Sequence, residues 1–195
     1  RDAVTDMLGS VRSLFAAGLS GHADPTRCLE LAFRLHRYWA ATNVAEGRFW
    51  LSRLLDQCPD SPWLAHATYA LGYLDYWSGE TDNAIAELQT VVALLEGVED
   101  PYAARALIYL AGLLDDLDRV PEAVEYVRRA IRAAQPFGID LRVAAAMGLG
   151  SVLSERGDPE AAKHASLAIE LCRSGGSAEQ RAAALPTAAM VCCQV

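Results

Sequence analysis

Residues 71–92 read LGYLDYWSGETDNAIAELQTVV, and the type of fold can be predicted from them. Apolar side chains recur in it at intervals of three and four, which is the spacing of one face of an α-helix. Gly79-Glu80 interrupts the run near its centre and supplies a tight turn between two helices. Small residues on either side, Gly72 and Ala84, let the two backbones approach closely. The stretch therefore predicts a hairpin of two packed helices.

The same pattern recurs along the chain. Positions equivalent to Ala84 are Ala123, Ala161 and, in a weaker early copy, Gly47, so the period is about 38 residues. Such repetition is typical of solenoids, in which each unit buries its apolar face against the next. The copies resemble tetratricopeptide repeats (TPRs), whose period is about 34 residues. We predict an all-α, TPR-like right-handed superhelix of antiparallel helix pairs; a generic helical bundle is the alternative.

Four Asp-Pro or Ser-Pro pairs mark helix starts, because each places a capping oxygen just before a proline suited to the first turn. They begin at Asp24, Ser61, Asp100 and Asp158. No segment alternates with a period of two, so we expect no sheet. The pattern predicts ten helices, roughly at 3–18, 25–41, 44–57, 62–78, 81–96, 101–117, 120–135, 139–156, 158–173 and 178–193.

These helices group into a linking or capping helix followed by repeats. We expect that helix within 1–24, repeats at 25–60, 61–99, 100–137 and 138–176, and the first helix of a truncated fifth repeat at 177–195. The chain starts with arginine rather than methionine and stops inside an apolar helical run. We therefore expect a piece excised from a longer protein.

Composition narrows the classes of function. The net charge of −8 repels phosphate backbones, so we expect no nucleic-acid contact from this segment. No stretch reaches the roughly 18 apolar residues of a membrane helix, so we expect no membrane contact. The chain has five cysteines, an odd number that cannot all pair with one another, and no two of them form a CxxC motif. This favours reduced thiols and a cytoplasmic location.

No sequence pattern indicates catalysis, a metal or a cofactor. The four histidines form no HExxH motif, and neither GxSxG nor the phosphate-binding GxxxxGK[ST] occurs. Asp115, Asp116 and Asp118 do not match the DDxxD of isoprenoid enzymes, because position 119 is arginine. We therefore expect a non-enzymatic protein that uses no cofactor.

Residues 25–57, PTRCLELAFRLHRYWAATNVAEGRFWLSRLLDQ, resemble the start of the TPR-like region in large bacterial regulators of the AfsR and LuxR type. The resemblance rests on the aromatic pair Tyr38-Trp39 and on residues 46–55, EGRFWLSRLL; Thr-Asn at 42–43 replaces the family's usual glycine. In such regulators a DNA-binding domain and an ATPase precede the repeats, which are thought to sense, self-associate or autoinhibit. The resemblance implies a regulatory role here, without ATP binding by this segment.

A TPR stack has a concave side that is lined mainly by the first helix of each pair. Tyrosines on that side would combine apolar contact with a hydroxyl, which suits a peptide or a flat small molecule. The alternative is that these rings serve packing between repeats. Aligning the repeats places on the concave side the candidate groove residues His36, Trp39, His66, Tyr69, Tyr73, Tyr76, Arg105, Asp115 and Asp116.

Two functions fit these observations. The leading hypothesis is a non-catalytic regulatory module of a bacterial transcriptional regulator that binds a protein or peptide segment, or a small-molecule effector. The alternative is a stand-alone TPR scaffold for protein assembly or for self-association as a homo-oligomer. Both use the same helical stack, so the repeat pattern alone does not separate them.

Overall fold

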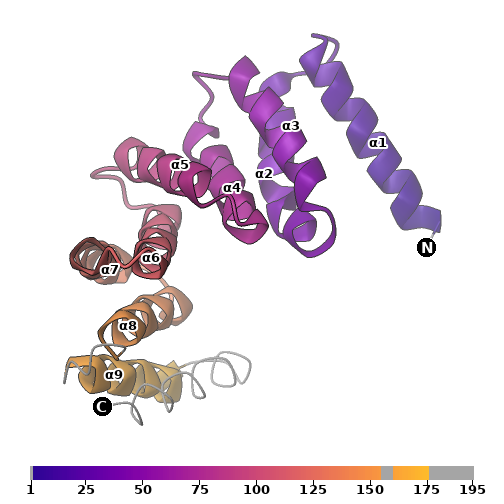
Figure 1. Cartoon of the computed structure of the whole chain (residues 1–195). Coiled ribbons are helices and arrows are strands. Elements are labelled where there is room, and N and C mark those ends of the chain that lie inside the picture. The colour runs from indigo at the N-terminus through magenta and orange to yellow at the C-terminus, as the bar shows by residue number, and fades with distance from the viewer. Residues whose placement is uncertain (1, 155–159, 176–195) are drawn as a thin grey trace. The chain divides into compact units, whose positions relative to one another are not determined.

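The computed structural model describes residues 2–154 and 160–175, and every regular element within them is an α-helix (Figure 1). The predicted all-α class is confirmed, and the helix ends lie within a few residues of the expected positions. The tenth expected helix, at 178–193, lies outside the described residues. The described helices are α1 (Asp2–Leu19), α2 (Pro25–Thr42), α3 (Val44–Gln57), α4 (Leu64–Ser78), α5 (Thr81–Leu94), α6 (Pro101–Asp116), α7 (Val120–Ala134), α8 (Ile139–Ser154) and α9 (Glu160–Gly175).

Asp24 and Asp100 cap α2 and α6 as the sequence predicts, whereas Asp158 lies outside the described residues. The Oδ1 atom of Asp24 accepts a hydrogen bond from the backbone N–H of Thr26 at 2.9 Å, and Asp100 caps α6 in the same way. Asn43 separates α2 from α3, and its Oδ1 accepts from the N–H of Glu46 at 3.3 Å. The φ of Asn43 is −158°, which is extended backbone, so this turn does not require a glycine.

Helix α4 begins later than the sequence predicts, at Leu64. The Ser61 hydroxyl accepts a hydrogen bond from the backbone N–H of Trp63 at 3.2 Å, and the Ser61 carbonyl accepts from Leu64 at 3.0 Å. A serine side chain that bonds its own backbone in this way favours a turn over a helix. At its other end α4 stops at Gly79, whose φ of 78° lies in the left-handed region and forms the predicted tight turn.

The helices group into two compact units, of which the first ends at Leu94 and the second begins at Leu95. In the first unit, α2 packs on α3 and α4 packs on α5, while the leading helices α2 and α4 also contact each other. Helix α1 packs against α2 and α3. In the second unit, α6 packs on α7, α8 packs on α9, and α6 contacts α8. Each unit is therefore a stack of helical hairpins of the predicted kind.

The small residues of the repeat lie at buried positions between packed helices. Ala84, Ala123 and Ala161 are completely buried. A Cβ atom added at Gly72 would lie 3.1 Å from the Cγ of Leu88, so the α4–α5 hairpin has little spare room. The predicted role of these residues in close helix packing is confirmed.

Among the glycines of the first unit, Gly47 has the least room for a side chain. A Cβ atom added there would lie 2.6 Å from the Cδ1 of Leu74 and 2.8 Å from the Cβ of Trp39. Carbon atoms at such distances overlap, so only glycine lets α3 approach α2 and α4 in this way. Trp39 is itself 2% exposed, with its ring centroid 6.1 Å from that of Phe15 on α1.

The cysteines of the described residues are free and buried. These are Cys28, Cys58 and Cys172. Burial raises the pKa of the Cys28 and Cys58 thiols, which keeps them protonated and weakly nucleophilic at neutral pH. Cys192 and Cys193 lie outside the described residues.

Candidate functional site

Aromatic rings from α2 and α4 pack against one another in the first unit. The ring centroid of His36 lies 5.3 Å from that of Tyr73 and 5.9 Å from that of Tyr69, both edge to face. One turn earlier on α2, the ring of Phe33 lies 5.3 Å from that of His66. The spacing of three and four residues places the α4 rings on one side of that helix. We call the following set the aromatic face: Phe33, His36, His66, Tyr69, Tyr73 and Trp77.

Exposure increases across the aromatic face. His36 and Tyr69 form its base, where 6% and 2% of their surfaces are exposed. Tyr73 and His66 are half-buried. Trp77 is 57% exposed and lies 6.2 Å from Tyr73, centroid to centroid. A partner would therefore reach Tyr73, His66 and Trp77, while the base holds these rings in place.

Two further candidates from α2 and α4 lie in different surroundings. Trp39 points into the core beside Phe15 and Gly47, so it offers a partner almost no surface. Tyr76 is half-buried, and its ring centroid lies 5.5 Å from that of Trp77. Of these two residues, only Tyr76 adjoins the aromatic face.

The remaining candidates lie in the second unit, on α6. Arg105 is exposed, with its guanidinium carbon 6.0 Å from the centre of the Tyr102 ring. Asp115 is half-buried and Asp116 is exposed at the other end of the helix. At 1.5 Å per residue, about 15 Å of helix separates the arginine from these carboxylates. Partner binding by these and by all other candidate groove residues stays a prediction.

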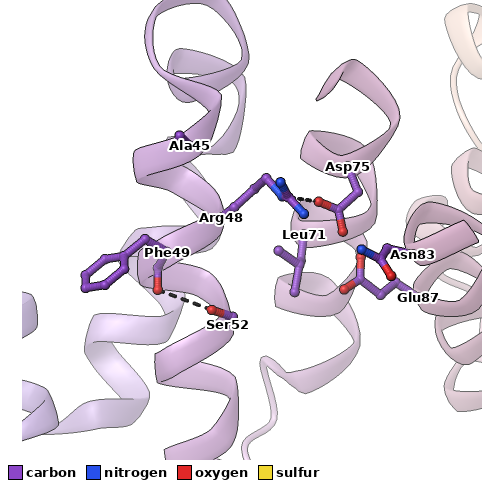
Figure 2. A pocket seen from close by; sticks show the side chains of 8 residues that line it. All are labelled: Ala45, Arg48, Phe49, Ser52, Leu71, Asp75, Asn83 and Glu87. Carbon is purple, nitrogen blue, oxygen red and sulfur yellow. Dashed lines mark hydrogen bonds and ion pairs between the residues drawn. The ribbon is translucent and has the colours of Figure 1, made fainter. Parts of the chain in front are cut away.

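A second site in the first unit was not predicted from the sequence. It is a pocket of about 450 Å³ between α3, α4 and α5. Figure 2 shows charged side chains from all three helices meeting there. We call it the polar pocket; its lining residues are Ala45, Arg48, Phe49, Ser52, Leu71, Asp75, Asn83 and Glu87.

Buried charges define the polar pocket. Asp75 is only 2% exposed and forms an ion pair with Arg48, which also lies 3.7 Å from a carboxylate oxygen of Glu80. The carboxyl groups of Asp75 and Glu87 lie close enough to interact electrostatically. Burial, and then the negative charge of Asp75, raises the pKa of Glu87 to about 8. Burial also raises the pKa of Asp75. At neutral pH the pocket therefore contains a protonated Glu87.

The Glu-Gly-Arg at residues 46–48, part of the stretch that resembles the regulators, joins α3 to the neighbouring helices of this unit. Glu46 accepts two hydrogen bonds from Arg12 of α1, at 2.6 and 2.8 Å, and this contact lowers the pKa of Glu46. Gly47 allows the close approach to α2 and α4, and Arg48 pairs with Asp75 of α4. The motif thus holds three neighbouring helices around α3.

Replacing Glu87 with glutamine is expected to remove a pH dependence of stability. The ordinary pKa of glutamate is 4.5, whereas folding raises that of Glu87 to about 8. The folded protein therefore binds more protons than the unfolded chain between these values, and the free energy of unfolding falls as pH rises from about 5 to about 8. Denaturation at several pH values, followed by tryptophan fluorescence, measures this slope. Equal slopes for the wild type and Glu87→Gln would contradict the expectation.

The described residues hold neither a metal-binding cluster nor a membrane-spanning helix. No cluster of three or more histidine, cysteine, aspartate or glutamate side chains there could hold a metal ion. None of the described helices is both long and apolar enough to span a membrane.

Comparison with known proteins finds no matching family model and no matching curated protein. Among solved structures, the chain is similar to the nearly identical TPR-like repeats of a Podosopora anserina kinesin light chain, with a TM-score of 0.70, 19% identity and 87% of each chain covered. MamA aligns with a TM-score of 0.65 and 22% identity over 88% of this chain and 86% of MamA. PilF of Pseudomonas aeruginosa aligns with a TM-score of 0.64 and 19% identity over 86% and 75% of the two chains. These likenesses show a TPR-like repeat fold.

Proposed function

We propose that this TPR-like protein binds an extended protein or peptide segment through the exposed part of its aromatic face. The observation that carries the proposal is the row formed by His66, Tyr73 and Trp77, which a buried layer of rings supports. Large amphipathic rings supply contact area and hydrogen bonds at low entropic cost, which is why they dominate many binding surfaces.

The aromatic face is ordered before any partner binds. The Nδ1 atom of His36 lies 2.5 Å from the carbonyl oxygen of Phe33 and donates to it, which fixes the imidazole ring. Tyr73 packs against the edge of that ring at a centroid distance of 5.3 Å. Side chains that are already held in one conformation lose less entropy on binding, which favours affinity.

Removing the exposed rings is expected to weaken peptide binding without unfolding the protein. Peptides selected from a random phage-display library on the full chain supply the ligands. For the double variant Tyr73→Ala with Trp77→Ala, we expect the dissociation constant to rise about tenfold or more, because each large ring at an interface contributes about 1 kcal/mol or more. Fluorescence anisotropy of labelled peptides measures the change.

Phe49→Ala is the matched control. Phe49 is an aromatic residue of the same unit, 46% exposed, and it lies on α3 beneath the guanidinium of Arg53, away from the aromatic face. Its removal is expected to leave peptide affinity unchanged. The proposal fails if no peptide is enriched, or if Phe49→Ala weakens binding as much as the double variant.

We further propose that this binding takes place within a bacterial transcriptional regulator. It is supported by the resemblance of residues 25–57 to AfsR- and LuxR-type regulators, in which the bound segment or a small-molecule effector would control the neighbouring domains. An upstream coding sequence for a DNA-binding domain and an ATPase would agree with this setting; unrelated upstream domains would favour the stand-alone scaffold. Self-association through the same unit would give a dimer in light scattering.

A further inference from the structure

The polar pocket is an open groove whose sides are α3 and α5 and whose floor is α4. Along their described lengths, α3 and α5 do not pack against each other, so the space above α4 stays accessible. Asn83 and Glu87 are one turn apart on α5 and face the same side. Figure 2 shows Arg48 and Asp75 directed toward each other across the groove. The ring of Phe49 points away from them, so its backbone side lines the pocket.

Carboxyl groups outnumber cationic groups in and beside the polar pocket. The charged groups that act on Glu87 are Arg48 of α3 and Asp75 of α4. Glu80, in the turn between α4 and α5, lies near Arg48 and Asp75. The single cation, Arg48, already pairs with Asp75 and lies near Glu80. The Oε2 atom of Glu87 is buried and accepts no hydrogen bond from any described residue. A buried acceptor without a donor costs free energy, which a ligand that donates to it would recover.

We propose that the polar pocket binds a small organic cation, whose ammonium or guanidinium group donates hydrogen bonds to the carboxylate of Glu87, a side chain that lines the pocket. The amide oxygen of Asn83, one turn away on α5, accepts a second hydrogen bond from the same group. Leu71 and Ala45 line the pocket and contact the apolar part of the ligand. The volume of about 450 Å³ lies in the range of pockets that hold small molecules.

Other ligand classes fit this pocket less well. An anion would have to compete with Asp75 for Arg48, and it would meet two further carboxyl groups nearby. A hard metal ion needs about six oxygen ligands, and no cluster of three or more acidic, histidine or cysteine side chains in the described chain could hold one. An organic cation needs only directed acceptors and an apolar wall, and the groove offers both.

Binding of the cation is coupled to proton release. The ligand takes the place of the Glu87 proton, so it binds the form of the pocket in which Glu87 is ionised. Below the pKa of about 8, only a fraction of the molecules has this form, and the apparent affinity falls in proportion to that fraction. The dissociation constant of the cation is therefore expected to rise about ninefold between pH 7 and pH 6.

Isothermal titration of the full chain with n-butylguanidinium tests the proposal. At about pH 8.5 we expect saturable binding with a dissociation constant on the order of 1 mM, as suits so small a ligand. Titrations at pH 7 in buffers of different ionisation enthalpy are expected to report release of close to one proton. Glu87→Gln is expected to weaken binding about tenfold or more at pH 8.5, and to abolish the pH dependence.

Two controls separate this site from a general charge effect and from the aromatic face. Glu96→Gln removes the same charge at an exposed position after α5, and it is expected to leave cation binding unchanged. The Tyr73→Ala and Trp77→Ala double variant is also expected to bind the cation normally. Absence of saturable binding at pH 8.5, or equal losses of affinity in the Glu87→Gln and Glu96→Gln variants, would overturn the proposal. Either result would leave the proposed peptide binding at the aromatic face unaffected, because that is measured separately.

Discussion

Trp39→Ala is expected to lower the free energy of unfolding of the first unit by about 3–5 kcal/mol, the cost of removing a fully buried indole and leaving a cavity. The side chain is 2% exposed and lies between Phe15 of α1 and the backbone at Gly47 of α3. Its loss therefore weakens the packing of three helices at once. Urea denaturation followed by circular dichroism measures the change.

Trp77→Ala is the matched comparison for this prediction. Trp77 belongs to the same unit, but 57% of its surface is exposed, so its removal leaves little cavity. We expect its cost to stay below about 1 kcal/mol, as for most exposed positions. Similar losses in the two variants would mean that Trp39 is not the core residue that its burial indicates. If instead the Trp39→Ala protein folds stably but binds peptides more weakly, Trp39 contributes to the peptide-binding groove.

Gly47→Ala is expected to destabilise the first unit by about 1–3 kcal/mol, although alanine favours helix formation over glycine by about 1 kcal/mol. The added methyl group would lie 2.6 Å from Leu74 and 2.8 Å from the Cβ of Trp39. The end of the leucine side chain can rotate away, but the tryptophan Cβ is fixed to its helix. Helix α3 must therefore move outward from α2.

Gly9→Ala provides the control for this substitution. Gly9 lies within α1 of the same unit, and a Cβ atom added there would meet nothing within 4 Å. Only the helix preference acts at that site, so Gly9→Ala is expected to leave stability unchanged or raise it by up to about 1 kcal/mol. All four tryptophans lie in the first unit, so tryptophan fluorescence reports its unfolding in both variants. Stabilisation by Gly47→Ala would contradict the close packing at α3.

Part of the aromatic face could be predicted from the sequence. Positions 66, 69 and 73 differ by three and four, so the sequence predicted that these rings share one side of α4, and their ring contacts agree. The sequence did not reveal that His36 and Tyr69 form a buried base. Their burial depends on how α2 meets α4, and the periodicity of one helix contains no information about that contact.

The polar pocket was missed because its charged residues come from separate helices. In the sequence Arg48 belongs to the stretch EGRFWLSRLL, and nothing in the residues around Glu87 distinguishes it from other acidic residues on a helix. Asp75 is the one residue of the pocket whose burial the sequence could have indicated. It is a lone acidic residue within the apolar run LGYLDYW, three positions after Gly72. A charge at a position that the helical period places among buried neighbours predicts a partner, although not which helix supplies it.

By itself, the sequence determined the helical class, the pairing of helices into hairpins and the positions that need small residues. These properties depend on local spacing, capping side chains and turn residues, and each can be recognised within one or two neighbouring helices. Only the tertiary structure decided that Trp39 is buried, that rings from α2 and α4 combine, and that Arg48, Asp75 and Glu87 meet in one pocket. Burial and pKa depend on what the other helices place around a residue, and that arrangement exists only after the hairpins have stacked.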